Sequence, residues 1–419
     1  MSEPALHALV LAGGDSTRIR TGGPKALLDL CGRPLLDWVL SAAEEATSGD
    51  RVLVVGPKHQ TEIEAWLQSS KHAAWRIALQ AEPLGTGDAV RCGLTGLPSE
   101  GRVLILCGDT PLLHPETLAA LADTEGGALL TTEVSDPTGY GRIVRDEDHA
   151  LTAIVEQADC DEATSVIQEI NAGVYLLPID LLAKALLDLK AENAQGEFYL
   201  PDAVLATMDV AGGVTLQLQD GENEILGVNT LLDHAQARSV LSERILMQHL
   251  SEGVIIDDPA STFIEDGVEI APGARLLPFT VIRSGCKIGS GCTVGPFSHL
   301  RTGTVLEEGA EVGNFVETKN AHLGAGVKAK HLSYLGDTTI GAQSNVGCGT
   351  ITANWDGRNK HKTEIGAGVS LGSGSILIAP VRIAAGAKTG AGAVVPANHD
   401  VAEKQVVVGV PARPLSPSS

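Results

Sequence analysis

Aromatic side chains and basic charge are both scarce in this sequence. Phe, Trp and Tyr make up 3% of its 419 residues, and 30 Lys and Arg stand against 52 Asp and Glu, which leaves a formal net charge of −22. Sequence-independent binding of nucleic acid needs a basic field, so this acidic excess argues against a nucleic-acid partner. It still leaves room for a local basic pocket that binds a small phosphate ligand.

The sequence also has no cysteine spacing, basic start or apolar run of the kinds that indicate disulfides, a leader segment or a membrane helix. The seven cysteines are odd in number and show no Cys-x-x-Cys pair, which predicts reduced thiols. The start, Met1-Ser2-Glu3-Pro4, has no basic region ahead of an apolar stretch, and no apolar run approaches the roughly 18 residues of a membrane helix. We therefore expect a cytoplasmic protein without a membrane partner.

Glycine is abundant instead, with 48 residues, and the chain divides near Gly253 into unlike halves. Residues 1–252 hold 38 acids, 16 bases and 23 glycines, whereas residues 253–419 hold 14 acids, 14 bases and 25 glycines. The first half therefore carries the whole net charge. The length predicts two or three domains.

The first half alternates short apolar runs with helical patterns. The predicted strands are residues 7–12, 51–56 and 103–107, and the predicted helices are residues 35–45, 61–67 and 115–122. Such alternation is typical of a mostly parallel wound sheet, whose ligand lies at the carboxyl ends of the strands. Residues 229–250 lack Gly and Pro and predict one long connecting helix.

The second half has a hydrophobic period of six, which neither a helix nor an alternating strand explains. Six residues for each short strand and turn, three to a coil, are typical of a parallel β-helix. Two breaks in the period, at about 313–333 and 353–364, predict loops, and the second is polar and basic. The nine positions of the first run are Ile264, Ile270, Leu276, Ile282, Ile288, Val294, Leu300, Leu306 and Val312. The phase recurs as Tyr334, Ile340, Val346 and Thr352, and again as Ile365, Leu371, Leu377, Ile383, Thr389 and Val395.

The first predicted strand runs into a glycine-rich segment that is followed by two cations. Gly13 and Gly14 let backbone N–H groups approach a phosphate, and Arg18 and Lys25 can hold a triphosphate from two sides. The alternative is a glycine turn with solvated charges. The segment has neither a Walker Gly-Lys-Ser/Thr sequence nor a dinucleotide G-x-G-x-x-G, which disfavours P-loop and Rossmann cofactor sites.

An acidic residue, Asp109, follows the predicted strand 103–107 at the ligand-facing end of the sheet. A carboxylate in that place can hold Mg²⁺ beside phosphates. The alternative is a helix N-cap for the segment after Pro111.

A series of short motifs runs through the first half in the order L-A-G-G-x-x-T-R, P-K, Q-A-E-x-L-G-T-G, G-D-x-P-L, P-T-G-Y-G-R, I-V-E, Q-E-I-N-A-G, N-A-Q-G-E-F-Y and G-V-N. The opening motifs match sugar nucleotidylyltransferases in general, and the last three are the specific part. The series resembles the uridylyltransferase domain of the bifunctional N-acetylglucosamine-1-phosphate uridylyltransferase / glucosamine-1-phosphate N-acetyltransferase family. This family usually has Gly where the chain has Ser16.

The resemblance implies that an oxygen of N-acetylglucosamine 1-phosphate attacks the α-phosphorus of UTP and releases pyrophosphate. Gly14, Arg18 and Lys25 would contact the triphosphate, and the two cations would be catalytic. Asp109 and Asn229 would ligate Mg²⁺. The uracil and ribose would be bound by Gln80, Gly85 and Thr86, and the sugar by Gly141, Glu156 and Asn171.

The resemblance continues through Gly313-Asn314-Phe315-Val316-Glu317, His331-Leu332-Ser333-Tyr334-Leu335-Gly336-Asp337 and Gly349-Thr350-Ile351-Thr352. It implies an acetyltransferase domain that uses acetyl-coenzyme A and glucosamine 1-phosphate. His331 would be the base and Glu317 its orienting partner. Arg301, Lys319 and Lys360 would hold the phosphate, Tyr334, Asn345 and Asn354 the sugar, and Asn354, Trp355, Ser373 and Ala391 the acetyl-coenzyme A. The family usually has Tyr in place of Trp355 and a basic arm beyond the last residues of this chain.

We therefore expect an α/β protein with a Rossmann-like nucleotidyltransferase domain over residues 1–229, a connecting helix over 230–252 and a left-handed parallel β-helix acetyltransferase domain over 253–419. Flat-sided solenoids usually bury their faces against one another, which predicts a homotrimer. The implied role is the supply of UDP-N-acetylglucosamine for peptidoglycan precursors of the cell wall.

Two other functions fit parts of the pattern. One is a sugar-1-phosphate nucleotidylyltransferase of other specificity whose β-helix only trimerises, as in glucose-1-phosphate adenylyltransferases. The motifs argue against this alternative, because uridine and an N-acetyl sugar are favoured by Gln80, Glu156 and Asn171. The other is a regulatory subunit, as in the translation initiation exchange factor. Such subunits tend to lose their catalytic loop residues, whereas this chain has Arg18, Lys25, Asp109 and Asn229.

Overall fold

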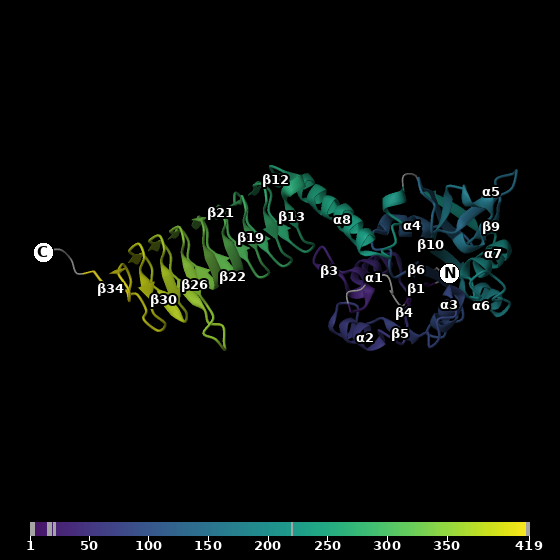
Figure 1. Cartoon of the computed structure of the whole chain (residues 1–419), viewed down its shortest axis with the longest axis horizontal. Helices are drawn as coiled ribbons and strands as arrows, with labels where there is room; N and C mark the ends of the chain where they lie inside the picture. The colour runs from purple at the N-terminus through teal and green to yellow at the C-terminus, as the bar shows by residue number, and fades with distance from the viewer. Residues whose placement is uncertain (1–4, 15–18, 20–21, 219–220, 416–419) are drawn as a thin grey trace. The chain divides into compact units, whose positions relative to one another are not determined.

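The computed structural model describes residues 5–14, 19, 22–218 and 221–415. The chain forms two compact units, residues 1–240 and 241–419 (Figure 1). The boundary lies inside the long helix α8 (Leu231–Ser251), where the sequence predicts a connecting helix. No helix among the described residues is long and apolar enough to cross a membrane.

The first unit is built on a mixed nine-stranded sheet. Its main path runs in the order β11 (Val214–Leu218), β7 (Ala128–Glu133), β10 (Glu169–Pro178), β6 (Arg102–Cys107), β1 (Leu6–Ala12), β4 (Arg51–Val55) and β5 (Arg76–Leu79). β8 (Arg142–Arg145) pairs with β10 and β9 (Leu151–Val155). β10 runs antiparallel to β6 and β7, whereas β6, β1, β4 and β5 are parallel. The three strands that the sequence predicts are confirmed.

Helices cover both faces of this sheet, so alternate residues of the central strands enter two separate cores. Ala8 and Val10 of β1 pack on one face with α1 (Leu35–Ala46), α2 (Gln60–Ser69) and α4 (Pro115–Ala122). Leu9 packs on the other face with α3 (Thr86–Leu94), α6 (Ile179–Leu187) and α7 (Leu200–Ala211). Burial on both faces explains why these strands read as unbroken apolar runs. A short helix, α5 (Glu162–Ser165), and a two-stranded ribbon of β2 (Asp29–Leu30) and β3 (Arg33–Pro34) complete the unit.

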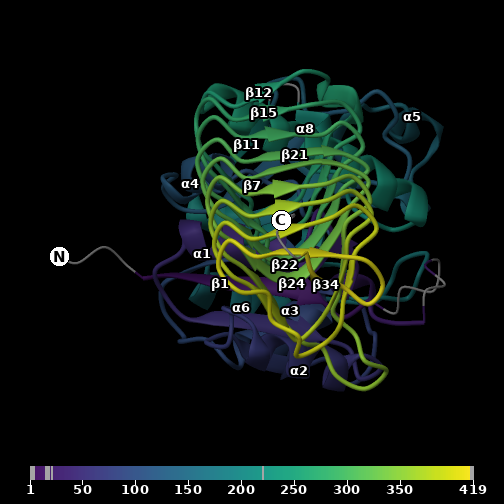
Figure 2. The same cartoon turned by 90° about the vertical axis from the view of Figure 1, so that its left-hand side faces the viewer.

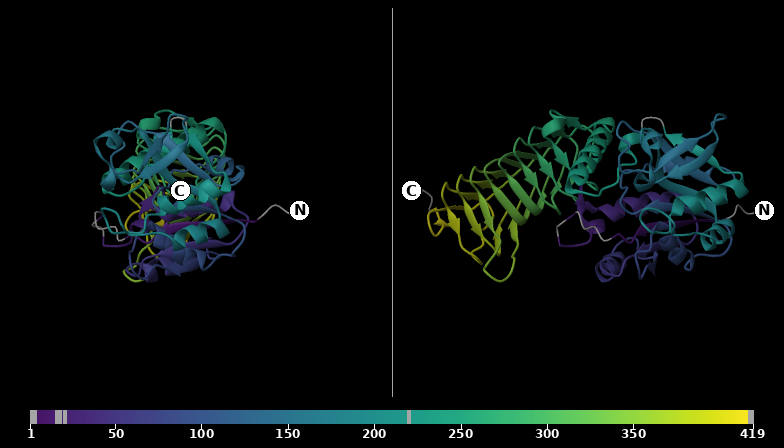
Figure 3. Two further views of the ribbon diagram at one scale, coloured as in Figure 1. Left: turned by 90° about the vertical axis from the view of Figure 1, so that its right-hand side faces the viewer. Right: turned by 45° about the vertical axis from the view of Figure 1, so that its right-hand side comes forward.

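The second unit is a left-handed parallel β-helix whose coils are stacked one on another (Figures 2 and 3). Its first face contains β12 (Ile255–Ile256), β15 (Arg275–Leu276), β18 (Thr293–Val294), β21 (Glu311–Asn314), β23 (Lys328–His331), β25 (Asn345–Val346), β28 (Ser370–Leu371), β31 (Lys388–Thr389), β33 (Val406–Val408) and the antiparallel β34 (Arg413–Pro414). The second face contains β13 (Phe263–Ile264), β16 (Val281–Ile282), β19 (His299–Leu300), β22 (Glu317–Leu323), β24 (Tyr334–Ile340), β26 (Ile351–Ala353), β29 (Ile376–Ile378) and β32 (Val394–Val395). The third face contains β14 (Glu269–Ile270), β17 (Lys287–Ile288), β20 (Val305–Leu306), β27 (Thr363–Ile365) and β30 (Val381–Ile383), and the long strands β22 and β24 continue onto it.

The period of six is confirmed, because all nine positions of the first run are buried. The prediction that Tyr334 occupies an inward position of the period is wrong, however. It is half-buried, whereas its neighbour Leu335 is fully buried and pairs with Thr318. The phase shift arises because Leu335 and Ile340 are only five residues apart, with Asp337 at the corner in a left-handed conformation (φ 47°), as Thr318 and Leu323 are on the preceding coil.

The two breaks in the period differ in kind. Through the first break the pairing separation falls by one, from the 18 residues between Leu300 and Thr318 to the 17 between Thr318 and Leu335, so this break is a shorter corner and no loop. At the second break Ile340 pairs with Ile365, a separation of 25 residues. Only the second break is therefore an inserted loop, and Figure 3 shows it extending beyond the neighbouring coils.

Candidate active sites

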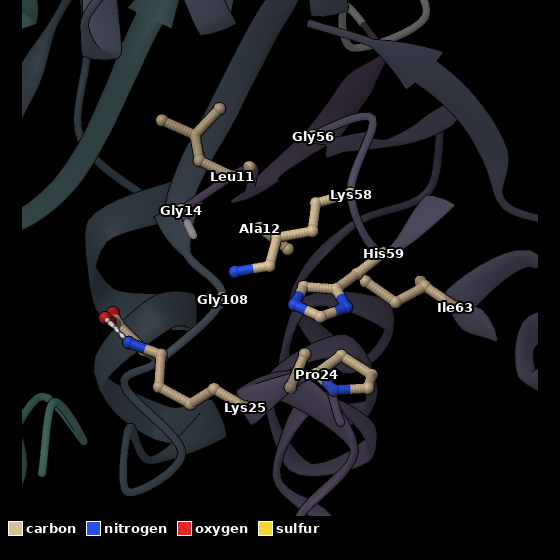
Figure 4. Close-up of a pocket in the computed structure, with 13 residues that line it drawn as sticks. Leu11, Ala12, Gly14, Pro24, Lys25, Gly56, Lys58, His59, Ile63 and Gly108 are labelled. Atoms are coloured by element: carbon tan, nitrogen blue, oxygen red, sulfur yellow. Dashed lines mark hydrogen bonds and ion pairs between the residues drawn. The ribbon is translucent and has the colours of Figure 1, made fainter. Parts of the chain in front are cut away.

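A pocket opens at the carboxyl ends of three adjacent parallel strands of the first unit, β6, β1 and β4 (Figure 4). Each strand is followed by a short loop that enters the lining. The lining residues are Leu11, Ala12, Gly13, Gly14, Pro24, Lys25, Ala26, Gly56, Lys58, His59, Ile63, Gly108 and Asp109. This is where an open α/β sheet places its ligand.

Glycine at position 56 allows the loops after β4 and β1 to come into contact. A Cβ added at Gly56, after β4, would lie 2.5 Å from the carbonyl oxygen of Gly13, after β1. Any larger residue at position 56 would push the two loops apart. The Gly13-Gly14 backbone is therefore held between its neighbours at the floor of the pocket.

Three predicted residues from distant parts of the chain meet beside this floor. The Lys25 ammonium donates to the Asp109 carboxylate at 2.7 Å and to the Asn229 side-chain oxygen at 3.3 Å. Lys25 and Asp109 are both mostly buried. The predicted triphosphate cation and the predicted metal ligands thus form one cluster. The predicted contact Arg18 and the departure Ser16 lie outside the described residues.

The residues predicted to bind uracil and ribose lie together at the next strand of the sheet. Gln80 directly follows β5 and is buried, and its amide donates to the Gly85 carbonyl at 3.0 Å and to Asp88 at 3.1 Å. Gly85 (φ 112°) precedes α3, and a Cβ there would lie 2.6 Å from the Phe198 carbonyl oxygen. Thr86 begins α3 and accepts a hydrogen bond from the Leu200 backbone. The Gln80 side chain is therefore fixed before any nucleotide binds.

The residues predicted to bind the sugar also converge. The Asn171 backbone N–H, on β10, donates to the Gly141 carbonyl at 2.9 Å, and a Cβ added at Gly141 would lie 3.4 Å from Glu156 Oε1. Burial raises the pKa of Glu156 above its usual value, and the carboxylates of Asp159 and Asp202 raise it further. A partly desolvated carboxyl group of this kind suits a hydroxyl or amide ligand.

In the second unit, the three cations predicted to hold a phosphate lie close together. The Lys319 pKa is lowered by the neighbouring Lys360 ammonium and, more weakly, by Arg301. Arg301 donates to Glu317 at 2.8 Å. The Glu317 carboxylate is thus engaged by Arg301 in the described chain, and its orienting role toward His331 stays a prediction.

Tyr334 and Asn354 form the next part of this cluster. The Asn354 amide donates to the Tyr334 hydroxyl at 3.4 Å and to the Asp337 carboxylate at 2.5 Å. A Cβ added at Gly336 would lie 2.4 Å from the Tyr334 hydroxyl oxygen, so the ring lies directly over the glycine backbone. A glycine that the sequence pattern did not single out therefore sets the place of Tyr334.

The predicted base and part of the predicted acetyl-coenzyme A groove occupy one corner of successive coils. Ladder pairing aligns Asn314 with His331, Val346 with Leu371 and Ser370 with Lys388. The same corner position is therefore occupied by His331, Cys348, Ser373 and Ala391. His331, Ser373 and Ala391 are exposed.

Asn345 is the predicted sugar contact that the structure separates from the others. It is exposed on β25, in the first face of the β-helix, whereas Tyr334 begins β24 in the second face. The two side chains therefore emerge from different faces of a single chain.

The inserted loop that carries Trp355 and Lys360 is a hairpin held by hydrogen bonds within the loop. Trp355 and Lys360 form an antiparallel bridge. Asp356 accepts from the backbone N–H groups of Arg358 and Asn359 at 2.7 Å and pairs with His361 at 2.7 Å. These hydrogen bonds lower the pKa of Asp356 to about 2. The exposed Trp355 ring, which is 58% accessible, is thus presented by an ordered loop.

Sequence reasoning missed Lys58 and His59, which line the first pocket, and Cys348 at the corner of the second site. Lys58 and His59 belong to no motif of the resemblance. Their position alone could have identified them, because they follow the predicted strand 51–56 at the ligand-facing end of the sheet.

Comparisons with known proteins agree with both halves. Residues 8–166 match the MobA-like NTP transferase domain family, and residues 261–298 match the bacterial transferase hexapeptide repeat. A solved UDP-glucose pyrophosphorylase bound to UDP-glucose has a TM-score of 0.48 and 17% identity, and covers 57% of this chain and 99% of that chain. This likeness is too low to carry an argument.

The full-length similarity is to proteins named bifunctional protein GlmU. The one from Trichlorobacter lovleyi is 41% identical over 93% of this chain and 92% of its own length, and the one from Streptomyces avermitilis is 41% identical over 92% and 88%. A nucleotidylyltransferase of other specificity or a regulatory subunit does not account for identity along both halves. The chain therefore belongs to the bifunctional GlmU family, the uridylyltransferases and acetyltransferases of UDP-N-acetylglucosamine synthesis.

Proposed function

We propose that the first unit transfers the uridylyl group at the pocket that contains Lys25, Asp109 and Asn229. The observation that carries this assignment is the meeting of these three side chains beside the Gly13-Gly14 backbone. An oxygen of N-acetylglucosamine 1-phosphate attacks the α-phosphorus of UTP, the bond to the β-phosphate breaks and pyrophosphate leaves. The chain forms no covalent bond, so positioning and charge neutralisation account for the catalysis.

The residues at this pocket fit a magnesium ion. Asp109 and Asn229 offer a carboxylate and an amide oxygen, and both oxygens already contact the Lys25 ammonium, which marks their common position as favourable for a cation. Mg²⁺ typically takes one or two such protein ligands and fills the remaining positions with phosphates and water. When bound, the ion would neutralise charge on the phosphates.

Around this centre, the Gly14 backbone would approach the phosphates and Arg18 would act with Lys25. Gln80, Gly85 and Thr86 would bind the uracil and ribose. Gly141, Glu156 and Asn171 would bind the sugar, which places the attacking 1-phosphate on the β10 and β6 side of the pocket.

We further propose that His331 is the base of acetyl transfer. It would take a proton from the ammonium of glucosamine 1-phosphate, after which the amine nitrogen attacks the thioester carbon, the carbon–sulfur bond breaks, and the proton that the nitrogen loses on forming the amide goes to the leaving coenzyme A thiolate. Arg301, Lys319 and Lys360 would hold the phosphate, with Tyr334, Asn345 and Asn354 on the sugar. Asn354, Trp355, Ser373 and Ala391 would line the acetyl-coenzyme A groove. The alignment of His331 with Ser373 and Ala391 at one corner supports this assignment.

A homotrimer is part of the proposal. Asn345 and Tyr334 emerge from different faces of one β-helix, so a sugar that contacts both needs the faces of two chains. Cyclic packing of three flat-sided solenoids supplies such clefts. We place the protein in the cytoplasm, where UTP and acetyl-coenzyme A are available.

Two assays test the proposal. The first incubates the protein with UTP, Mg²⁺ and N-acetylglucosamine 1-phosphate and measures pyrophosphate; the second supplies glucosamine 1-phosphate and acetyl-coenzyme A and measures free thiol. Asp109→Ala should abolish only the first activity and His331→Ala only the second. A variant that loses both would contradict two independent sites, and a monomer mass by light scattering would rule out the trimer.

A further inference from the structure

The loop after β4 lines the nucleotide pocket but has no part in the assignment above. It contains Gly56, Pro57, Lys58 and His59, and it stands beside the Gly13-Gly14 loop on the side away from Asp109. Figure 4 shows Lys58 and Lys25 reaching into the pocket from different sides. The pocket therefore receives a second cation from an element that the family motifs do not include.

Strand register explains why Lys58 reaches the phosphate region. Ala12 pairs with Val55, and Leu11 pairs with Cys107, so the loops after β1, β4 and β6 begin at nearly the same height in the sheet. The close approach of Gly56 to the Gly13 carbonyl fixes the loop after β4 against the Gly13-Gly14 loop. Lys58 follows two residues later, above the sheet edge.

The same loop leads directly into α2, whose ten residues begin at Gln60 with His59 as the N-cap residue. His59 lines the pocket, so the positive end of the α2 dipole lies at the pocket wall beside Lys58. Glu62, the acid in the first turn of this helix, pairs with the His59 ring at 3.0 Å. Lys58 and the N-terminus of α2 therefore favour an anion at this wall, and the Glu62 carboxylate offsets part of that attraction.

The pocket lies in the acidic half of the chain, because residues 1–252 hold 38 acids and 16 bases. Lys25 shares its charge with Asp109 at 2.7 Å. A UTP polyphosphate brings about four negative charges, and the anion is stabilised only where cations are placed for it.

The direction of the reaction tells which phosphates lie near Lys58. The proposed sugar contact Asn171 is on β10 and Asp109 follows β6, so the attacking oxygen comes from that side of the pocket. In an in-line displacement the leaving group departs opposite the attacking oxygen. Continuing along the sheet from β6 through β1, the opposite side is the loop after β4.

We propose that Lys58 is a binding residue for the β- and γ-phosphates of UTP and for the pyrophosphate that leaves. This inference rests on the proposed uridylyl-transfer site and adds a residue to it. Lys58 contacts the group that departs, whereas Lys25 acts beside Asp109 where the α-phosphate reacts. The nucleotide is thus held by cations on both sides of the glycine loop.

The test measures binding of inorganic pyrophosphate with Mg²⁺ by calorimetry and the KM values of the forward reaction. Lys58→Gln should weaken pyrophosphate binding about tenfold, as expected for loss of one charge-assisted hydrogen bond. It should raise the KM for UTP to a similar extent and leave the KM for N-acetylglucosamine 1-phosphate unchanged. Lys58→Arg, which keeps the charge, should restore most of the affinity.

Lys184→Gln is the matched control, because Lys184 is an exposed lysine on α6, an element that contributes no residue to this pocket. It should behave as the wild type. Each variant should keep its acetyltransferase activity, which shows that the chain is folded. Unchanged pyrophosphate affinity and UTP KM in Lys58→Gln would overturn the inference, whereas a wild-type protein that releases no pyrophosphate would overturn the uridylyl-transfer site itself.

Discussion

The Lys25 ammonium donates a hydrogen bond of 2.7 Å to the Asp109 carboxylate, although 84 residues separate them in the sequence. Lys25 also donates to Asn229, so one ammonium occupies the space between the two proposed metal ligands. A divalent cation and Lys25 therefore compete for the same two oxygens.

This competition predicts opposite effects of one substitution. Lys25→Gln should lower the rate of uridylyl transfer by about 10²- to 10³-fold, because a donor to the reacting phosphates is lost. The same change should tighten the binding of Mn²⁺ to the nucleotide-free protein, measured by electron paramagnetic resonance. Weaker Mn²⁺ binding would contradict the shared position of the ammonium and the metal ion, and acetyl transfer serves as the folding control.

Glu156→Gln should stabilise the free protein while weakening sugar binding. Because burial raises the folded-state pKa of Glu156 above its unfolded value of 4.5, the ionised carboxylate costs stability at neutral pH. The gain in Tm should be largest near pH 7 to 8 and should vanish as the pH falls below about 4.5, where the carboxyl group is protonated in both states.

The KM for N-acetylglucosamine 1-phosphate should rise about tenfold in the same variant, because a charged hydrogen-bond acceptor becomes a neutral one. Calorimetry at several pH values checks the first effect and steady-state kinetics the second. A Tm that falls at pH 7 would show that the carboxylate is stabilised by partners that outweigh its burial.

Asp356→Ala should slow acetyl transfer by disordering the loop that carries Lys360. The Asp356 Oδ1 accepts from two backbone N–H groups and Oδ2 pairs with His361, so alanine removes all three contacts, and a displacement of about 1 Å in a binding group can cost about a hundredfold in rate. Because the Asp356 pKa is lowered to about 2, its stabilisation is complete above pH 3.8 and is lost only as the pH falls through 2. The carboxylate stays ionised between pH 6 and 8, so the loss in Asp356→Ala should not depend on its titration in that range.

Asp400→Ala is the matched control for the loop variant. Asp400 also accepts from a backbone N–H group, that of Arg382, but on another coil. Equal losses in the two variants, measured as kcat/KM for glucosamine 1-phosphate, would mean that the damage is general to the β-helix.

Gly336→Ala should impair acetyl transfer through Tyr334. The added methyl group would lie 2.4 Å from the Tyr334 hydroxyl oxygen and 2.8 Å from the Asn354 amide, so both side chains must move. We expect a higher KM for glucosamine 1-phosphate, by about tenfold or more, since two hydrogen-bonding groups are displaced. In Tyr334→Phe the ring stays and only the hydroxyl is lost, so this variant should show a smaller increase. Wild-type kinetics in Gly336→Ala would place Tyr334 away from the sugar.

Mixed trimers test whether each acetyl-transfer site combines two chains. Tyr334→Ala and Asn345→Ala should each be inactive alone, because these side chains emerge from different faces of one β-helix. Unfolding and refolding an equal mixture should restore about one quarter of the wild-type sites, because a site is intact when each chain supplies its unaltered face. A mixture without activity would place Tyr334 and Asn345 on the same side of the cleft.

Local patterns were sufficient to predict much of the fold. The burial of β1 on both faces and the period of six each arise from short-range rules, so the strand 7–12 and the inward positions from Ile264 to Val312 could be predicted. Tyr334 could not be placed correctly, because a coil shortened by one residue shifts the phase without changing composition. Leu335 reveals the shift only through its pairing with Thr318.

The convergence of candidate site residues could be predicted where a motif contains them. Lys25, Asp109 and Asn229 stand in three motifs, and the structure brings them together. Lys58 stands in none, and its place in the pocket depends on the sheet order β6, β1, β4, which a single sequence does not reveal. The engagement of Glu317 by Arg301 is equally invisible in the sequence, because it depends on side-chain reach between neighbouring coils.

The 25-residue spacing around the inserted loop has a consequence for how this protein can change. Ile340 and Ile365 remain paired across the insertion, and the coils on either side continue as if it were absent. In a stack where each coil contacts only its neighbours, a change in such a loop does not alter the strand pairing of the other coils. The tip that presents Trp355 can therefore be lengthened, shortened or exchanged without shifting the register of any strand, at little cost to the stack.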